Sequence, residues 1–489
     1  MISIQKSLEL QHPDIQLPDY DPTEIKAGIA HIGVGNFHRA HQAYYTHQFL
    51  NNSNEKNWGI IGISITNSGP AMAEKFEKQD HLYTLTEFAP DGAKDISVVG
   101  AIVDYFPAKN QEKEALQILA DEDIKIVSLT ITEGGYYVDD NGNFDIEHEN
   151  IQYDLQHPEA PQTAFGYIVY ALALRKQNQI PAFTVLSCDN VQHNGDVTKK
   201  AVLSFAQAVD KELAKWIEEN ASFPNSMVDR ITPSIDKEDK AQLNDASGIE
   251  DAIPVYAEKF TQWVIEDYFS MGRPDWEIAG ATFVEDVTPY ETLKLRFLNA
   301  SHSMLAYPAV LMGYTHVDKA MEDPYLKKYL IDFMNKDISP IVEVPENVQL
   351  KSYKQSLIER FSNPAVSDQL ARLCYHGGAK IPGFILPSLK EILSRGSDTK
   401  RISFLLAAYG HYLKEKEDNL GNEIVPETPK LNEADWQLIH QENDAAFLQI
   451  SPFKDFELTE NDAFVQEYLA FRKQLRLSYV KNILESLIV

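Results

Sequence analysis

Side chains that could do acid–base chemistry recur at helical spacing between residues 291 and 302. At about 100° per residue, Glu291, Lys294 and His302 share an arc of roughly 80° with two leucines, and Asn299 lies at the edge of that arc. A charge on an apolar face is costly unless it is paired, and burial lowers the pKa of a lysine amine towards the range where it can act as a base. Oxidation of an alcohol needs such a base, together with donors that hold the oxygen as it becomes a carbonyl. The alternative is a helix on which Lys294 extends to solvent and His302 is an ordinary core residue.

Two glycines between a predicted strand and a predicted helix form a candidate phosphate-binding turn. The strand covers residues 27–32, and Gly33, Val34 and Gly35 follow it before a helical pattern begins. Glycines at such a turn let the backbone approach a pyrophosphate closely. His38 stands where the dinucleotide fingerprint has its third glycine. The residues alone are also compatible with an ordinary strand-to-helix turn.

Other polar residues have a structural and a functional interpretation. Asn190 follows a predicted strand, where an amide commonly caps a helix or forms an Asx-turn. Asp229 is adjacent to Arg230, and a local salt bridge is the simplest reading of that pair. Arg372 and Lys380 flank two glycines and are compatible with solvated basic groups near a helix end.

Strand and helix patterns alternate in the first half of the chain. The predicted strands cover residues 27–32, 58–65, 96–105, 124–131 and 182–188, with helical patterns such as 111–120 and 164–176 between them. This alternation predicts a parallel sheet covered on both faces, with ligands beyond the carboxyl ends of the strands.

Long helical patterns dominate after about residue 289. Examples cover residues 403–414, 435–447 and 461–488. We therefore predict an α/β protein with a Rossmann-like, doubly wound, dinucleotide-binding domain over residues 1–286 and a mostly α-helical substrate and catalytic domain over residues 287–489.

Composition narrows the function classes. The chain has 489 residues, 44% of them hydrophobic, and a formal net charge of −29. A surface this acidic repels phosphate backbones and anionic membranes, so we expect no nucleic-acid or membrane partner. Cys188 and Cys374 are too few for a disulfide scaffold and suit a reducing compartment. With no signal-peptide pattern and no apolar run near 18 residues, a cytoplasmic protein is expected.

The spacing Lys294-x4-Asn299-x2-His302 resembles the catalytic helix of the mannitol dehydrogenase family, the polyol-specific long-chain dehydrogenases, and the resemblance extends through nearly the whole chain. It implies that Lys294 is the general base and that Asn190 and Asn299 polarise the reacting oxygen. An amide suits this role because it donates a hydrogen bond without carrying a charge. His302 would orient the reacting oxygen or the next hydroxyl, and we expect Glu291, one turn before Lys294, to relay the proton to solvent.

The resemblance also implies substrate and cofactor residues. Asp229 would contact the polyol hydroxyls or Lys294, and Arg372 and Lys380 would donate to the distal hydroxyls. Glu133, also assigned to the substrate, belongs to the segment of residues 130–136 that would line the nicotinamide pocket. Arg39 would add a cation beside the phosphates. The residues assigned to the cofactor are Gly33, Val34, Gly35, Phe37, Arg39, Thr66, Asn67, Ser68 and Thr132.

The loop after the strand over residues 58–65 bears on the choice of cofactor. In NAD-selective proteins a carboxylate at this point binds the adenosine ribose. Relatives carry acids at the positions of Ser68 and Gly69, but this chain has no acid, arginine or lysine from Thr66 to Gly69. This departure leaves the preference for NAD over NADP open. NAD is the expected cofactor, and NADP is the alternative.

These inferences define an expected function. The chain resembles a two-domain NAD(P)-dependent dehydrogenase that interconverts a sugar alcohol and a ketose, with D-mannitol and D-fructose as the first choice. Alternatives are a fructuronate or tagaturonate reductase, a D-arabinitol dehydrogenase and a non-catalytic sugar- or nucleotide-sensing protein. No metal is expected, because the two cysteines are far apart and His38, His41 and His193 lack a ligand pattern. The subunit number is left open, with a monomer as one option.

Overall fold

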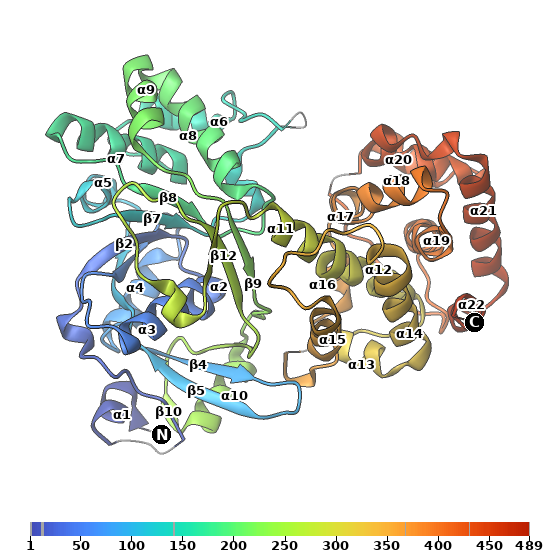
Figure 1. Ribbon diagram of the computed structural model, residues 1–489, viewed down its shortest axis with the longest axis horizontal. Helices are drawn as coiled ribbons and strands as arrows, with labels where there is room; N and C mark the ends of the chain where they lie inside the picture. Colours follow the sequence, from blue (N-terminus) through green and yellow to red (C-terminus); the bar gives the residue numbers. More distant parts are fainter. Residues whose placement is uncertain (1, 11–13, 140–141, 367, 430, 489) are drawn as a thin grey trace. The chain divides into compact units, whose positions relative to one another are not determined.

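The computed structural model describes residues 2–10, 14–139, 142–366, 368–429 and 431–488. The chain divides into two units, one of residues 1–89 and 93–288 and the other of residues 90–92 and 289–489. The N-terminal unit is a layered α/β domain, whereas the described part of the C-terminal unit consists almost wholly of helices (Figure 1). The predicted fold class is therefore confirmed.

Five parallel strands form the main sheet of the N-terminal unit. In spatial order they are β6 (Ile102–Pro107), β3 (Gly59–Ser64), β2 (Ala27–Ile32), β7 (Ile126–Leu129) and β8 (Thr184–Ser187). Because every neighbouring pair is parallel, all five carboxyl ends lie at one edge. Ile60 and Ile126 enter one hydrophobic cluster, whereas the next residues, Ile61 and Val127, enter another. Both faces are buried, which explains why these strands are continuous apolar runs.

Helices cover both faces of this sheet (Figure 1). One face packs against α5 (Glu112–Ala120), α7 (Ala164–Asn178), α8 (Asn194–Val209) and α9 (Lys211–Asn220). The other face packs against α3 (Gln42–Asn52) and the buried rings of Trp263 and Trp276. The further helices of this unit are α1 (Ile4–Leu10), α2 (Asn36–Ala40), α4 (Gly69–Glu77), α6 (Glu149–Gln156) and α10 (Lys237–Ser247).

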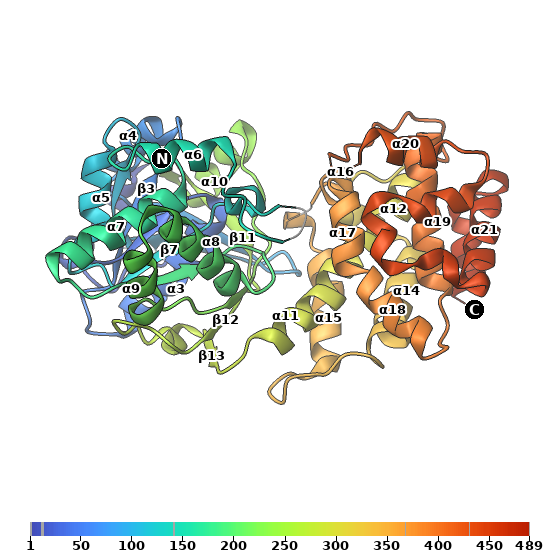
Figure 2. The ribbon, with the colours of Figure 1, turned by 90° about the horizontal axis from the view of Figure 1, so that it is seen from above.

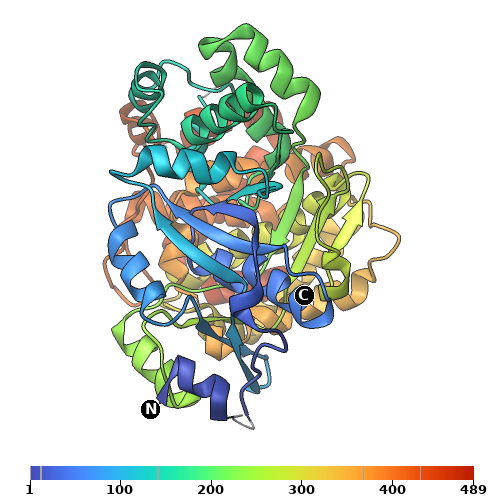
Figure 3. The same cartoon turned by 90° about the vertical axis from the view of Figure 1, so that its left-hand side faces the viewer.

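Smaller sheets flank the main one. Their strands, in spatial order, are β11 (Val255–Glu258), β4 (Tyr83–Phe88) and β5 (Lys94–Val99) in one sheet, and β13 (Thr282–Val284), β12 (Gln262–Glu266) and β9 (Ser226–Asp229) in another. A short parallel pair joins β1 (Ile2–Ser3) to β10 (Ile249–Glu250). Figure 3 shows α1, in dark blue, close to the yellow-green helix α10 at this end of the unit.

One predicted strand is two strands. The run over residues 96–105 contains the end of β5 and the start of β6, which belong to different sheets. The chain leaves one sheet at Gly100 and Ala101 and enters the other at Ile102. Residues 96–99, Ala101 and Ile102 are all buried, so the apolar pattern continues through the break and hides it.

The C-terminal unit is built around α19 (Lys400–Glu415), which contains the predicted helix over residues 403–414. Residues 401–413 of α19 are all buried, and the helix lies between α12 (Ala300–Leu311) and α21 (Asp462–Leu477) (Figure 2). The other helices are α11 (Thr288–Lys294), α13 (Val317–Glu322), α14 (Pro324–Asp332), α15 (Leu350–Phe361), α16 (Leu370–Cys374), α17 (Gly377–Phe384), α18 (Leu386–Ser394), α20 (Glu433–Ile439) and α22 (Val480–Leu487). Across the described residues, none of the helices combines the length and the apolar character that a membrane span requires.

Two predicted helices are shorter than expected. The pattern over residues 435–447 ends as a helix at Ile439 and resumes in a 3-10 helix, Asp444–Gln449. The pattern over residues 461–488 is broken between α21 and α22, where Ser478 is extended (φ −148°, ψ 155°). The amphipathic period continues on both sides of each break, so the sequence pattern alone does not mark the turn.

Candidate active site

The turn after β2 is tight on one side and open on the other. Gly33 has a φ of +98°, and a Cβ there would lie 2.2 Å from the Thr130 carbonyl oxygen, so only glycine fits. A Cβ on Gly35 would have only the Gly33 oxygen near it, at 4.0 Å. The chain then enters α2 directly, with Gly35 as the N-cap. This geometry fits a turn whose backbone approaches the pyrophosphate of a dinucleotide.

A buried histidine supports this turn from below. His31, on β2, lies 2.8 Å from Ser128 Oγ and 2.9 Å from Thr130 Oγ1 through its two ring nitrogens. The Thr130 hydroxyl donates to the Gly33 carbonyl oxygen at 2.7 Å. Burial lowers the pKa of His31 to about 3, so the ring is neutral near pH 7. His31 was not among the predicted site residues, although a histidine inside a buried strand was visible in the sequence.

The side chain of Arg39 lies inside the domain and supports the glycine turn. Its side chain is buried, and its guanidinium donates to Asn36 Oδ1 at 2.7 Å, to the Gly35 oxygen at 3.3 Å and to the Ile253 oxygen. These bonds brace the glycine turn from inside the domain. A direct contact between Arg39 and the cofactor phosphates stays a prediction, as do the contacts of Val34 and Phe37.

The loop after β7 is strained. Thr132 has a φ of 61° and a ψ of 166°, a backbone region that is costly for a β-branched residue, and the 3-10 helix η2 (Glu133–Tyr136) follows it. Asp189, after β8, accepts hydrogen bonds from the backbone N–H groups of Ile131 and Thr132, both at 2.9 Å. It also accepts one from the Tyr136 hydroxyl at 2.8 Å. One carboxylate therefore holds the whole loop in place.

Asp189 was missed by sequence reasoning, which assigned a role at the site only to the neighbouring Asn190. The carboxylate instead reaches across to the neighbouring strand's loop. Burial raises the pKa of Asp189, while the three donors oppose that shift. The signal available in the sequence was an acid directly after an apolar strand, next to the exposed Asn190.

The predicted residues of the N-terminal unit gather at the carboxyl edge of the main sheet. The loops after β2, β3, β7 and β8 carry, in turn, Gly33 to Gly35, Thr66 to Ser68, Thr132 with Glu133, and Asn190. In the loop after β3, Thr66 Oγ1 lies 3.2 Å from Ser64 Oγ and 2.9 Å from Ser68 Oγ. A row of strand ends of this kind is where dinucleotides bind in doubly wound folds.

Asp229 ends β9 and is buried, paired in register with Gln262 of β12. Its neighbour Arg230 forms a buried ion pair with Glu87 and donates to the Glu258 oxygen at 3.0 Å. Asn194 helps to position β9, because its amide donates to the Ser226 oxygen at 2.8 Å. Arg230 is thus engaged within the domain, and a substrate role for Asp229 stays a prediction.

In the C-terminal unit the helix that carries Lys294 differs from the predicted one. Between α11 and α12 the helix contains a π-helical segment, η4 (Leu295–Asn299). Because π hydrogen bonds span five residues, Lys294 and Asn299 lie close to one full turn apart, whereas regular α spacing places Asn299 at the edge of the arc. Among the described lysines only Lys294 is buried, at 8% exposure, and Glu291 is 4% exposed. Single π turns inside α-helices occur frequently at functional sites.

His302 lies in a charged cluster of the same unit. Its ring centroid is 4.6 Å from that of Phe361. Burial lowers the pKa of His302 to about 3, and the charges of Asp368, Arg372 and Lys380 act on it as well. The ring is therefore neutral near pH 7 and can donate from one nitrogen.

Arg372 and Lys380 are neighbours in this cluster. Lys380 Nζ donates to the Leu373 oxygen at 3.0 Å and to the Arg372 oxygen at 3.2 Å. The Arg372 guanidinium makes a bidentate ion pair with Asp368, with one of its bonds 2.7 Å long. Sequence reasoning missed Asp368, although an acid four residues before an arginine on one helical period predicts such a pair.

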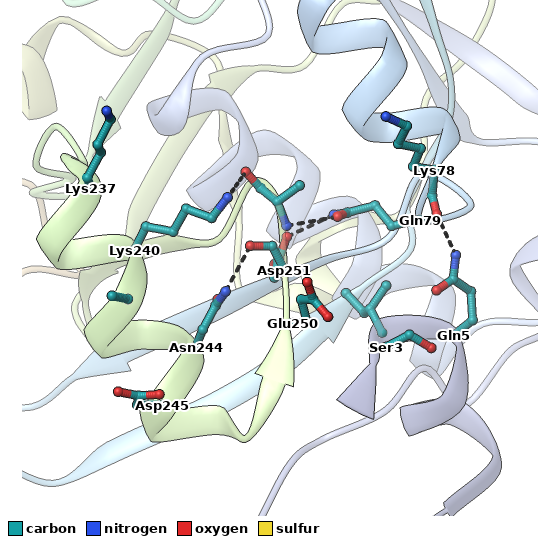
Figure 4. A pocket seen from close by; sticks show the side chains of 13 residues that line it. Ser3, Gln5, Lys78, Gln79, Lys237, Lys240, Asn244, Asp245, Glu250 and Asp251 are labelled. Atoms are coloured by element: carbon teal, nitrogen blue, oxygen red, sulfur yellow. Dashed lines mark hydrogen bonds between the residues drawn. The ribbon is translucent and has the colours of Figure 1, made fainter. Parts of the chain in front are cut away.

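A pocket of about 510 Å³ lies elsewhere in the N-terminal unit, among α1, the end of α4, α10 and β10. Figure 4 shows Lys78, Lys237, Lys240, Asp245 and Glu250 around it. Its lining includes none of the predicted site residues. As for metals, the described part of the chain contains no group of three or more histidine, cysteine, aspartate or glutamate side chains that could hold an ion.

Two family models cover most of the chain. The model of the mannitol dehydrogenase Rossmann domain matches residues 27–278, and that of the mannitol dehydrogenase C-terminal domain matches residues 286–475. The chain belongs to the mannitol dehydrogenase family. It is an NAD(P)-dependent polyol dehydrogenase of that family, as the resemblance of its motifs implied.

Several relatives of this family are similar over most of their length. The polyol:NADP oxidoreductase of Gluconobacter oxydans is 43% identical over 480 residues, which is 98% of each chain. The mannitol 2-dehydrogenase of Pyrenophora tritici-repentis is 39% identical over 459 residues, 93% of this chain and 80% of that one.

Two solved structures are also similar. The mannitol 2-dehydrogenase of Pseudomonas fluorescens, a ternary complex with NAD and D-mannitol, is 40% identical and has a TM-score of 0.88, covering 100% of this chain and 99% of that one. A D-sorbitol dehydrogenase in substrate-free form is 42% identical with a TM-score of 0.91, covering 98% and 99%.

Proposed function

We propose that this enzyme interconverts D-mannitol and D-fructose, with Lys294 as the base in oxidation and the acid in reduction. One observation supports this most directly. The single buried lysine among those described lies on the π-turned helix, with Glu291 one turn before it and Asn299 about one turn after it. The chain that carries this helix is 40% identical along its whole length to a mannitol 2-dehydrogenase whose structure holds NAD and D-mannitol.

The proposed chemistry assigns a task to each side chain. In oxidation the substrate hydroxyl loses its proton to the Lys294 amine, and the carbon of that hydroxyl loses a hydride. The bound nicotinamide supplies the acceptor for the hydride. Asn190 and Asn299 donate hydrogen bonds to the oxygen as it becomes a carbonyl, and neutral His302 donates to it or to the next hydroxyl. Glu291 passes the proton on towards solvent.

The cofactor residues of the N-terminal unit fit a dinucleotide. Gly33 admits no side chain, and Gly35 has open space beside it, so a pyrophosphate can approach the backbone there. Thr66, Asn67 and Ser68 offer neutral polar groups at the position of the adenosine ribose. We propose that the enzyme accepts both NAD and NADP, because no acid in this loop repels a 2′-phosphate.

Polyols are favoured over uronates as substrates. Asp229, Glu133 and Glu291 are all assigned to the site, and a substrate carboxylate would meet like charges there. A neutral polyol instead donates hydroxyl hydrogen bonds to a carboxylate and accepts them from Arg372 and Lys380. D-Sorbitol is the second candidate, because the D-sorbitol dehydrogenase structure is as similar to this chain as the mannitol 2-dehydrogenase structure is.

Initial rates test the proposal. The purified enzyme is assayed with NAD and NADP against D-mannitol, D-sorbitol, D-arabinitol and D-mannonate, following reduced nicotinamide by absorbance. We expect the highest kcat/KM with D-mannitol, and activity unchanged by a metal chelator. A clear preference for mannonate would replace the polyol assignment, and chelator inhibition reversed by zinc would replace the lysine mechanism with a metal-dependent one.

We also propose a cytoplasmic location and a monomer. Cys188 and Cys374 are both free, buried thiols, which suits a reducing compartment. Size-exclusion chromatography with light scattering is the check on the subunit number, and a mass near 55 kDa is the expected result.

A further inference from the structure

The turns that follow β3 and β6 are neighbours at the carboxyl edge of the main sheet. The two strands pair in parallel, with Ser64 opposite Pro107. The backbone N–H of Ala108 then donates to the Ser64 oxygen at 2.8 Å. Lys109, the next residue, is therefore next to the loop Thr66–Gly69, although about 40 residues separate the two in the chain.

Lys109 contacts this loop directly. Its ammonium group donates a hydrogen bond to Asn67 Oδ1, and its side chain is exposed. It forms no ion pair with any residue that the structure describes. The nearest acid along the chain, Glu112, accepts a hydrogen bond from the backbone N–H of Asn110 at 2.9 Å. The Lys109 ammonium thus lies beside the end of β3, and no carboxylate of the described residues forms an ion pair with it.

The groups beside Lys109 suit a phosphate. Ser68 is exposed and makes no side-chain capping bond to α4, so its hydroxyl is available apart from its contact with Thr66 Oγ1 at 2.9 Å. The Asn67 amide, the Ser68 hydroxyl and the Lys109 ammonium all donate hydrogen bonds. The loop has no acid to oppose them.

The position of these groups in the fold indicates which phosphate they would bind. In doubly wound sheets the strand next to the one that carries the glycine turn ends at the adenosine ribose. An acid there binds the 2′-hydroxyl, and a nearby cation accommodates a 2′-phosphate. Here β2 carries the glycine turn and β3 is the next strand. We infer that Lys109, with Asn67 and Ser68, binds the 2′-phosphate of NADP and so determines how well this enzyme uses NADP. This inference rests on the proposed function only for the identity of the cofactor, not for that of the polyol.

Binding of adenosine 2′,5′-bisphosphate and of 5′-ADP, measured by calorimetry on the intact enzyme, tests this without turnover. Lys109→Ala should weaken bisphosphate binding about tenfold, the usual scale for losing one phosphate contact of this strength, and leave 5′-ADP unchanged. Lys109→Arg should retain most of the bisphosphate affinity. The matched control is Lys113→Ala, because Lys113 is four residues further on and is paired with Glu159 at 2.6 Å.

Kinetics supply the second readout. Lys109→Ala should raise the KM for NADP about tenfold, with kcat and the KM for NAD close to the parent values. Equal bisphosphate affinity in the parent, Lys109→Ala and Lys113→Ala would overturn the inference, as would a parent enzyme that binds 5′-ADP but not the bisphosphate. If D-mannitol proves not to be the substrate but bisphosphate binding still depends on Lys109, the proposed substrate is wrong and this inference stands.

Discussion

Burial distinguishes Lys294 from every other lysine that the structure describes. Proton abstraction from a hydroxyl requires a neutral amine, and we propose that Lys294 supplies it. Glu291 lies about one turn before Lys294 and Asn299 about one turn after it on the same helix. At the scale of single residues, the proposed chemistry therefore depends on Lys294.

The first prediction is that Lys294→Ala lowers turnover by about 10²–10⁴, the usual contribution of a general acid–base group, and leaves cofactor affinity close to that of the parent. Steady-state kinetics with D-mannitol and calorimetry with the cofactor measure the two effects. Lys319→Ala is the control, because Lys319 is an exposed lysine of the same unit, bonded to Glu322 at 2.8 Å. Near-parental turnover in Lys294→Ala would remove this residue from the mechanism.

The second prediction concerns pH and the buried His31. Its pKa is lowered from 6.5 in the unfolded chain to about 3 in the folded one, so the unfolded state binds the extra proton between these values. The contribution of His31 to the free energy of unfolding is therefore fully present above about pH 6.5, and it is lost as the pH falls towards 3. His47 and His302, with pKa values also lowered to about 3, act in the same direction.

Thermal unfolding at pH 7 and pH 5 measures this effect. Tm should fall on acidification of the parent, and His31→Asn should reduce that fall although it lowers Tm at pH 7. His440→Asn, at an exposed position, is the control and should keep the parental difference. Identical pH differences in all three proteins would show that His31 is not the group that titrates.

At the scale of elements, loops from neighbouring strands support one another. Asp189, after β8, holds the loop after β7 through three hydrogen bonds, and Thr132 in that loop keeps a backbone conformation that costs about 1–3 kcal/mol for a residue of its kind. Strain of this size persists only where the surroundings impose it. The contacts of Asp189 therefore impose the conformation of this loop, which leads directly into Glu133.

The third prediction follows from this arrangement. Asp189→Asn keeps the shape of the side chain but replaces an acceptor oxygen with a donor amide, so at least one of the backbone bonds is lost. We expect faster amide hydrogen exchange over residues 131–136 and a lower kcat/KM, with the glycine turn after β2 unaffected.

Asp154→Asn is the matched control for this experiment. Asp154 is also buried, and it accepts bonds from the backbone of Gln162 and Thr163 and from the Thr163 hydroxyl. It should lower stability to a similar extent without changing exchange at residues 131–136. Equal kinetic losses in both variants would mean that the effect of Asp189 is general destabilisation.

At the scale of the whole molecule, a net charge of −29 acts on every charged ligand. Exposed charges interact over about 8 Å at physiological ionic strength, so an anionic substrate is repelled on approach while a neutral polyol is not. The acidic residues that we assign to the site would also repel a substrate carboxylate at short range.

The fourth prediction is that D-fructose is preferred over D-fructuronate in kcat/KM by a factor of ten or more, since about 1.4 kcal/mol of differential binding gives tenfold. Added salt should raise the value for fructuronate and leave that for fructose unchanged. Competition between equal concentrations of the two is the direct measurement. Consumption of fructuronate first would assign this enzyme to the uronates.

The sequence by itself determined the features that depend on local patterns, namely the parallel sheet, its glycine turn and the family. Apolar runs and glycines predicted the parallel sheet and its turn, because residues 27–35 need only their own periodicity and backbone freedom to form that strand and turn. The string Lys294-x4-Asn299-x2-His302 identified the family, which the comparisons confirm. The roles of these residues, and the boundary near residue 286, stay predictions.

Only the tertiary structure decided the contacts between segments that are distant in the chain. It divided one apolar run between two sheets, because burial on both sides of Gly100 leaves no pattern in the sequence. It also showed a π turn in the helix after Lys294, which the sequence periodicity does not reveal. It also brought Asp189 to the loop after β7 and Lys109 to Asn67. These last two contacts depend on which strands are neighbours in the sheet, and strand order is set by the packing of the whole domain rather than by any single segment.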